Sequence, residues 1–154
     1  MHIYTLEYRQ LIKAPMPRVW DFFSAPANLG KITPSRMNFR IIRMDGDRMF
    51  PGQRIEYRVS VLPLVRLTWE TEITEVEENR MFVDEQRRGP YSLWRHRHSF
   101  REIPEGVEMT DRIDYGVPFG LLGRLANWLF VEQQVKAIFA YRFEAAEEIF
   151  NRPS

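Results

Sequence analysis

The sequence has no cysteine among its 154 residues. This absence excludes disulfide bonds, metal sites built on thiolates and a cysteine nucleophile. An excess of charge is also missing, because 22 basic and 21 acidic residues leave a formal net charge of +1. A general electrostatic footprint for nucleic acid is therefore not expected. No apolar run approaches the length of a membrane span or forms the core of a leader segment, so we expect a cytoplasmic protein without integral membrane association.

The residues that are present have the composition of an ordinary folded protein. Hydrophobic residues make up 44% and charged residues 28% of the chain. The length suits one domain over residues 1–154 with a single core. Aromatic residues reach 14%, and their rings can fill a core or line a pocket for a carbon-rich ligand. Composition does not decide between these uses, but it favours a neutral or apolar partner.

The clearest periodic pattern is an apolar stripe between Phe119 and Phe150, with steps of three and four residues. It consists of Leu121, Leu125, Trp128, Val131, Val135, Ile138, Phe139, Ala145, Ala146 and Ile149. The pattern predicts a long amphipathic helix from about Gly120, with Trp128, Val135 and Phe139 buried. Trp128 could instead face a membrane or a partner, but a wide aromatic stripe on a covering helix is more typical of a core.

Most of the remaining chain alternates between apolar and polar residues, which predicts an antiparallel sheet. Two short helices are expected after the first strand, one opened by Pro17 and one around Asn28 to Ile32. Pro63 is expected at a turn, and Pro153 is expected to help end the long helix. The expected strands are Ile3–Ala14, Met37–Met44, Gln53–Leu62, Val65–Glu77, Arg80–Arg88, Ser92–Ile103 and Val107–Val117.

Three local segments carry a resemblance to a known superfamily. They are Pro51 and Gly52 before the strand of Tyr57, the segment FVDEQRRGPYSLWRHRHSF (82–100) and the segment TDRIDYGVPFGLLG (110–123). Together with the order of elements, they resemble the START-like superfamily, also called SRPBCC, and its polyketide cyclase/dehydrase-like proteins. The resemblance covers the whole chain. It implies an α+β helix-grip fold, in which a curved sheet of about seven strands and a long C-terminal helix enclose a cavity for hydrophobic molecules.

The strand after the Gly89–Pro90 turn places its most unusual residues on one face. Trp94, His96, His98 and Phe100 share one parity, whereas the arginines of this strand have the other. The aromatic face is expected to look inward. The same argument on the neighbouring strands adds further inward polar groups, namely Asp84, Gln86 and Asp111. Buried polar groups are costly unless they are paired, so this set must form a network or meet water or a ligand.

Several roles are open for this set of residues. It can be a structural network in which carboxylates orient the histidines, or it can supply the few polar groups that orient a ligand in an apolar pocket. A third role is acid–base catalysis by His96 or His98 with Asp84 or Asp111 as partner. A His-x-His pair with a carboxylate also matches some zinc sites. Because nothing in the sequence defines a third ligand, we predict no metal and no cofactor.

The leading hypothesis is therefore a protein that binds a small hydrophobic or amphipathic molecule between the long helix and the sheet. The alternative is an enzyme of the same fold with a pocket histidine as acid or base, and a third possibility is a filled core without a ligand. An internal cavity separates the first two from the third. The predicted ligand-binding residues are Tyr57, Trp69, Gln86, Trp94, His96, His98, Tyr115, Trp128 and Val135.

Overall fold

The computed structural model describes residues 1–62 and 64–152. The turn expected at Pro63 and the helix end expected at Pro153 lie outside these ranges. In the described part of the chain, seven strands form one sheet and follow the expected segments closely. Their bounds are β1 (Tyr4–Ile12), β2 (Arg40–Met44), β3 (Arg54–Leu62), β4 (Val65–Glu77), β5 (Met81–Arg88), β6 (Leu93–Ile103) and β7 (Gly106–Gly116).

All neighbouring strands of the sheet are antiparallel, in the order β1-β7-β6-β5-β4-β3-β2. The first two strands of the chain are therefore the two edges of the sheet. Two short helical elements follow β1, the α-helix α1 (Met16–Phe23) and the 3-10 helix η1 (Pro26–Ile32). The second strand begins at Arg40, later than expected, because Ser35–Met37 forms a further 3-10 turn, η2. The predicted helix-grip fold is confirmed.

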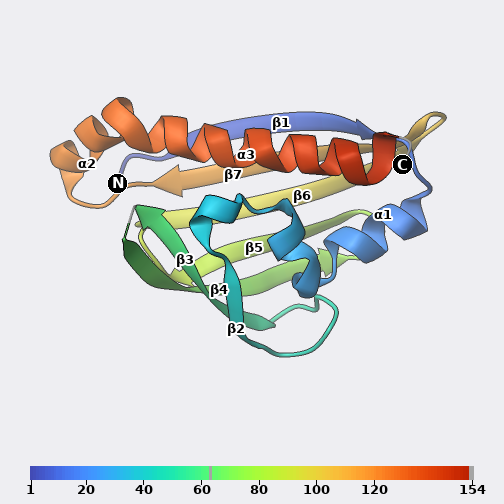
Figure 1. Ribbon diagram of the computed structural model, residues 1–154, viewed down its shortest axis with the longest axis horizontal. Helices are drawn as coiled ribbons and strands as arrows, with labels where there is room; N and C mark the ends of the chain where they lie inside the picture. Colours follow the sequence, from blue (N-terminus) through green and yellow to red (C-terminus); the bar gives the residue numbers. More distant parts are fainter. Residues whose placement is uncertain (63, 153–154) are drawn as a thin grey trace.

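A continuous helical segment from Gly120 to Asn151 follows β7. It comprises α2 (Gly120–Ala126), the π-helical turn η3 (Asn127–Val131), α3 (Glu132–Ala146) and a second π-helical turn, η4 (Glu147–Asn151). Figure 1 shows this segment running along the sheet near β1 and β7. Side-chain contacts hold it there, since Gln10 of β1 donates a hydrogen bond of 2.9 Å to the carbonyl oxygen of Phe143.

The stripe that faces the sheet differs from the one expected over the first turns of this segment. The buried positions are Gly123, Asn127, Val135, Phe139, Arg142, Ala146 and Phe150. Within α3 they recur at the ordinary α-helical steps of three and four, whereas the π-helical turns at Asn127–Val131 and Glu147–Asn151 contain more residues per turn. The predicted burial of Val135 and Phe139 is confirmed. The predicted burial of Trp128 is wrong, because its side chain is 75% exposed on the opposite face.

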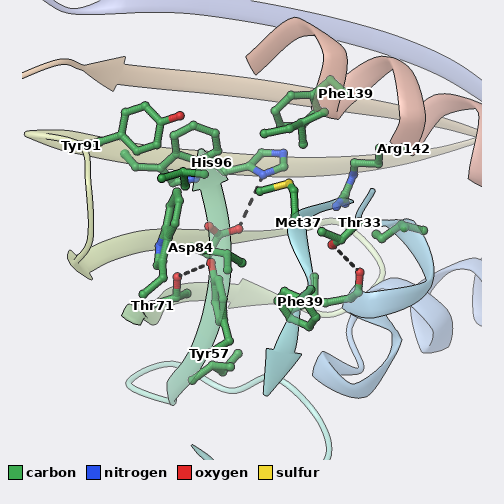
Figure 2. A pocket seen from close by; sticks show the side chains of 18 of the residues that line it. Thr33, Met37, Phe39, Tyr57, Thr71, Asp84, Tyr91, His96, Phe139 and Arg142 are labelled. Atoms are coloured by element: carbon green, nitrogen blue, oxygen red, sulfur yellow. Dashed lines mark hydrogen bonds and ion pairs between the residues drawn. The ribbon is translucent and has the colours of Figure 1, made fainter. Parts of the chain in front are cut away.

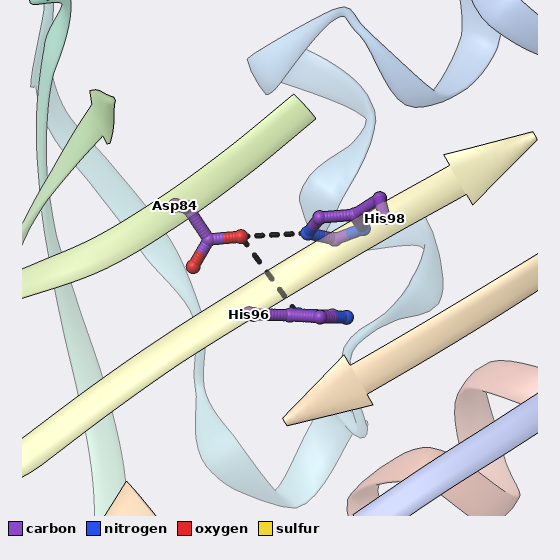
Figure 3. A group of neighbouring side chains, drawn as sticks. All are labelled: Asp84, His96 and His98. Carbon is purple, nitrogen blue, oxygen red and sulfur yellow. Dashed lines mark hydrogen bonds and ion pairs between the residues drawn. The ribbon is translucent and has the colours of Figure 1, made fainter. Parts of the chain in front are cut away.

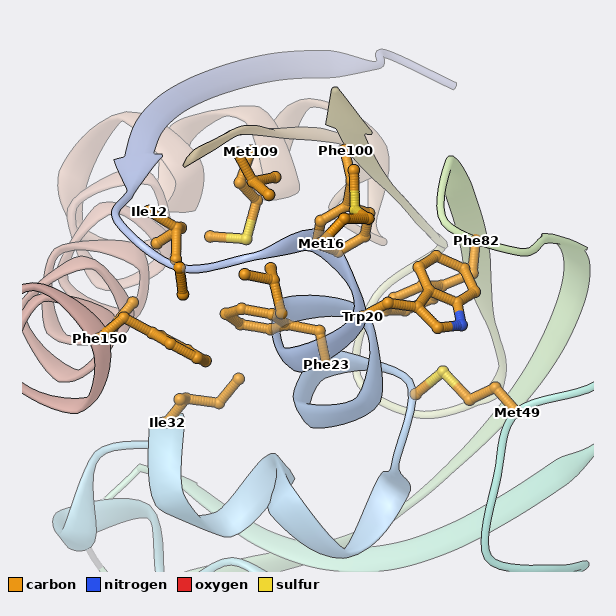
Figure 4. Close-up of a cluster of buried hydrophobic side chains, with 14 of the residues drawn as sticks. Ile12, Met16, Trp20, Phe23, Ile32, Met49, Phe82, Phe100, Met109 and Phe150 are labelled. Carbon is orange, nitrogen blue, oxygen red and sulfur yellow. The ribbon is translucent and has the colours of Figure 1, made fainter. Parts of the chain in front are cut away.

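Two clusters of buried apolar side chains form the core. The larger one joins α1 to the sheet and to the end of the long helix, as Figure 4 shows for Trp20, Phe23, Phe100 and Phe150. Ring contacts hold this cluster together, with Trp20 and Phe100 centroids 5.5 Å apart in an edge-to-face arrangement. The second cluster surrounds Trp69, Trp94, Tyr115, Val135 and Phe139. Side chains from both clusters line a space between them.

Candidate functional site

The space between the two clusters is a cavity of about 440 Å³. Figure 2 shows that its walls come from the strands, from α3 and from the 3-10 segments. This volume lies in the range of sites that hold small molecules, about 300–1,000 Å³. The 3-10 segments and the chain after them contribute Thr33, Met37 and Phe39, whereas α3 contributes Gln134, Ile138, Phe139 and Arg142.

Aromatic rings from neighbouring strands form one wall of the cavity. Tyr57 and Trp69 are cross-strand partners, and their rings stack with centroids 5.8 Å apart. Trp94 meets Trp69 edge to face at 5.4 Å, and Tyr91 lies against Trp94 at 4.9 Å. Strand alternation places the rings of Tyr57, Trp69 and Trp94 on the inner face of the sheet, and Tyr91 joins them from the turn before β6. The wall therefore offers a broad apolar and aromatic surface to a ligand.

A buried cluster of ionisable side chains forms the polar part of the cavity (Figure 3). Strand register creates it, because Asp84 is paired with His96 across β5 and β6 and His98 with Asp111 across β6 and β7. His98 Nε2 lies 2.6 Å from Asp84 Oδ2, and His96 Nε2 lies 2.7 Å from Asp111 Oδ1. Arg142 reaches the cluster from α3, with Nη2 at 3.2 Å from His98 Nδ1.

The hydrogen bonds of His98 define which ring nitrogen carries its proton. An arginine can only donate, so Nδ1 of His98 accepts from Arg142 and the ring proton resides on Nε2, where it is donated to Asp84. Burial lowers the pKa of His98 well below its ordinary value, and the nearby His96 and Arg142 lower it further. The ring is therefore neutral and oriented at physiological pH.

The two carboxylates have opposite environments. Burial alone would raise the pKa of Asp111, but the charge of Arg142 and the hydrogen bond from His96 outweigh it and hold that pKa well below its usual range. Asp111 is thus an ionised acceptor behind the cavity wall, and it orients the ring of His96. The pKa of Asp84, in contrast, is raised by burial. Because Asp84 lines the cavity, it can exchange hydrogen bonds or a proton with a ligand.

Two donors on the cavity wall find no hydrogen-bond partner among the described residues. They are Nε1 of Trp69 and Nε of Arg142, and the latter lies 3.9 Å from Asp111 Oδ2 behind the wall. A buried donor without an acceptor is costly, so such groups usually meet water or a ligand. The wall therefore combines a large apolar surface with a few polar side chains, Asp84, His96 and Arg142 among them.

The same cluster has the ligand types of a metal site. Asp84, His96 and His98 each offer one atom, and these atoms lie within 4.8 Å of one another. However, Nε2 of His98 already holds the proton donated to Asp84, and the positive Arg142 adjoins the same ring. A cation would have to displace that proton beside a guanidinium group, so this arrangement suits hydrogen bonding better than metal binding.

The structure places five of the nine predicted ligand-binding residues on the cavity wall, and it places Asp84 there as well. These five are Tyr57, Trp69, Trp94, His96 and His98. The other four have different surroundings. Gln86 binds the backbone of Tyr91 through two hydrogen bonds of 2.7 and 3.1 Å, which brace the turn after β5. Trp128 is exposed to solvent. Tyr115 and Val135 are fully buried in the packing between sheet and helix.

Tyr115 shows why a buried tyrosine need not face a ligand. Its hydroxyl group donates a hydrogen bond of 2.7 Å to Asn127 Oδ1 of η3. Burial raises the pKa of Tyr115 to about 12. The side chain therefore fastens the start of the long helix to the sheet and has no free polar group for the cavity.

Sequence reasoning missed several residues of the cavity wall, most notably Arg142. An arginine within the apolar stripe of α3, between Phe139 and Ala146, is a signal that could have indicated a buried partner for the carboxylates. Met37 and Phe39 were missed because they lie in and beside an irregular 3-10 segment, for which alternation has no meaning.

The curved antiparallel sheet, the long helix across it and the cavity between them define a helix-grip protein of the START-like (SRPBCC) class. The sequence matches the family described as polyketide cyclase / dehydrase and lipid transport over residues 12–149. The chain belongs to this family. No curated protein has a sequence that matches it.

Solved structures share this fold at low sequence identity. The chain superposes on the di-domain ARO/CYC protein BexL of the BE-7585A biosynthetic pathway with a TM-score of 0.74 at 16% identity, over 99% of this chain and 51% of BexL. A protein from Chromobacterium violaceum gives a TM-score of 0.71 at 10% identity, over 97% and 99% of the two chains. The major latex-like protein 151 of Panax ginseng gives 0.70 at 13%, again over 97% and 99%. These likenesses establish the fold.

Proposed function

We propose that this protein binds a small amphipathic molecule, largely hydrophobic and with one or more acceptor oxygens, in the cavity between the sheet and α3. The observation that carries the proposal is the composition of the cavity wall. Its aromatic rings suit a flat or hydrophobic body, and the guanidinium group of Arg142, which also lines the cavity, suits carbonyl or anionic oxygens. Membership in the family is consistent with this type of ligand.

The proposal is tested with a variant that fills the cavity from the helix. Ile138 lines the cavity, whereas its neighbour Ala137 is exposed. Ile138→Trp is expected to reduce binding of the fluorescent probe 1-anilinonaphthalene-8-sulfonate by at least about tenfold, since the indole occupies the space of the probe. Ala137→Trp adds the same ring on the solvent side and should bind the probe like the wild type.

Fluorescence titration of both variants, together with their thermal midpoints, shows whether the probe binds in this cavity. Equal probe binding by Ile138→Trp and Ala137→Trp in folded protein would contradict a ligand site in this cavity. Mass spectrometry of compounds extracted from the purified wild-type protein then identifies the natural ligand class.

The second candidate function is acid–base catalysis on the bound molecule. It is favoured by one observation: Asp111 orients His96 through a 2.7 Å hydrogen bond, and Nδ1 of His96 lies 3.7 Å from Asp84 on the cavity wall. Such a pair could move a proton to or from a ligand. If the protein is an enzyme, compounds extracted from the wild type and from His96→Gln will differ in structure, as product and substrate, which chromatographic retention and fragment masses distinguish. For a carrier, the two extracts contain the same compound.

A further inference from the structure

The start of the long helical segment is inverted relative to an ordinary surface helix. Its small and polar residues Gly123 and Asn127 face the protein, and the hydrogen bond from Tyr115 fixes this orientation. Its large apolar residues face outward, between 50% and 78% exposed. They are Leu121, Leu122, Leu125, Trp128, Leu129 and Phe130. An exposed apolar surface of this kind marks an interaction site.

A second exposed apolar segment lies at the same end of the molecule. Figure 1 shows α2 projecting past the sheet at the end of the long axis where β3 terminates. Leu64, which precedes β4, and Val65, the first residue of β4, are exposed. A hydrogen bond from Gln134 to the carbonyl oxygen of Val61 ties the end of β3 to the helical segment. Leu64 also belongs to the rim of the cavity. We call α2, η3 and the two residues Leu64 and Val65 the apolar end of the molecule.

The charges of the apolar end indicate what covers it. Residues 116–131 contain one ionisable side chain, Arg124, and residues 59–69 contain one as well, Arg66. Neither segment has a carboxylate. A symmetric contact with a second copy would place the same patch on both sides, so these arginines would meet no opposite charge. A bilayer with anionic lipids supplies both an apolar interior and the missing negative charge.

We propose that the apolar end docks onto the surface of an anionic lipid bilayer. Trp128 then lies at the boundary between headgroups and acyl chains, the position that tryptophan favours, while Arg124 contacts lipid phosphates. The docked molecule keeps the cavity rim at Leu64 near the bilayer. The proposal is independent of the proposed function, because docking requires no ligand in the cavity.

Cosedimentation with vesicles tests the docking directly. The full chain is expected to sediment with vesicles of phosphatidylcholine and phosphatidylglycerol, and to do so less with phosphatidylcholine alone. The double variant Leu122→Ser/Trp128→Ser should lose at least about tenfold in vesicle affinity, since burial of even one large apolar side chain is worth about that factor. Arg124→Ala should lose about fivefold on the anionic vesicles only.

A matched control removes exposed apolar side chains elsewhere. Ile42 and Phe50 are also exposed but lie outside the apolar end. The variant Ile42→Ser/Phe50→Ser should sediment like the wild type. Both double variants should keep the thermal midpoint of the wild type, which shows that lost binding does not reflect unfolding.

Tryptophan fluorescence gives a second readout of the same event. Three of the four tryptophans are buried, with 3% of Trp20, 6% of Trp69 and 8% of Trp94 exposed, against 75% of Trp128. A blue shift on addition of anionic vesicles therefore reports Trp128, and Trp128→Phe should abolish the shift while retaining most of the sedimentation.

Wild-type protein that stays in the supernatant, or equal sedimentation by both double variants, overturns the proposal. So does a dimer in solution that Leu122→Ser/Trp128→Ser converts to a monomer without any vesicle binding, since the surface is then covered by a second copy.

Discussion

The histidine between Asp84 and Arg142 links the candidate site to the stability of the protein. His98 is 2% exposed and neutral, and its two ring nitrogens are both engaged. The ordinary pKa of a histidine is 6.5, and the folded state lowers it. Below pH 6.5 the unfolded chain therefore binds more protons than the folded protein. The free energy of unfolding is expected to fall as the pH drops through this value, by up to about 1.4 kcal/mol per pH unit.

Chemical denaturation between about pH 7.5 and 6 measures this slope. His98→Gln should flatten it, although the variant will be less stable overall because Arg142 loses its acceptor. His2→Gln changes an exposed histidine and should keep the slope. Asp84 acts in the opposite direction. Because the folded state raises its pKa, the contribution of Asp84 to the free energy of unfolding falls as the pH rises from the ordinary value of 3.8. A slope that survives in His98→Gln would contradict the assignment.

Individual site residues could be predicted only where the backbone is regular. Strand alternation correctly indicated that His96, His98 and Asp111 face the interior. Alternation cannot show that Gln86 turns its amide group to the backbone of the adjacent turn, because that contact depends on the turn geometry. The role of His96 and His98 in ligand binding stays a prediction until the variants described above are measured.

At the scale of the element, the long helical segment depends on a few fully buried side chains. Val135 has no exposed surface and packs in the cluster around Trp94 and Phe139. Val135→Asp is expected to lower the free energy of unfolding by several kcal/mol or to prevent folding, because it buries a carboxylate without a partner. The exposed neighbour provides the control, since Gln133→Asp should leave the thermal midpoint nearly unchanged. A small effect of Val135→Asp would mean that α3 packs in another orientation.

The bounds of the elements could be read from the sequence because hydrophobic periodicity and turn residues agree along most of the chain. The rotation of the long helix about its axis could not. The π-helical turns at 127–131 and 147–151 change the step between buried positions. No residue pattern in the chain predicts these turns, so Leu121, Leu125 and Trp128 were assigned to the wrong face, whereas Val131 is partly buried against the core as expected.

At the scale of the whole molecule, the cavity couples ligand binding to global stability. Its walls come from the sheet, from α3 and from the 3-10 segments together, so a ligand that requires all of them binds the folded state alone. 1-Anilinonaphthalene-8-sulfonate at about a hundred times its dissociation constant is expected to stabilise the wild type by about 2.7 kcal/mol. A rise in thermal midpoint checks this for the wild type, and Ile138→Trp should show at most about half of the stabilisation, because its affinity for the probe is at least about tenfold lower. A wild-type midpoint that does not respond to the bound probe would place the probe outside the cavity.

The order of the strands has a consequence for how the chain reaches this structure. Among the strands that the structure describes, β1 pairs only with β7, so that Tyr4 lies opposite Tyr115 and Ile12 opposite Val107. During synthesis the first strand must therefore wait until the last strand has left the ribosome, while the meander from β2 to β7 can pair step by step. Closing so long a loop is slow because the entropy of the intervening chain must be lost first. The earliest strand to be made is thus expected to be among the last to find its place, and an unpaired β1 is the segment that a chaperone would encounter.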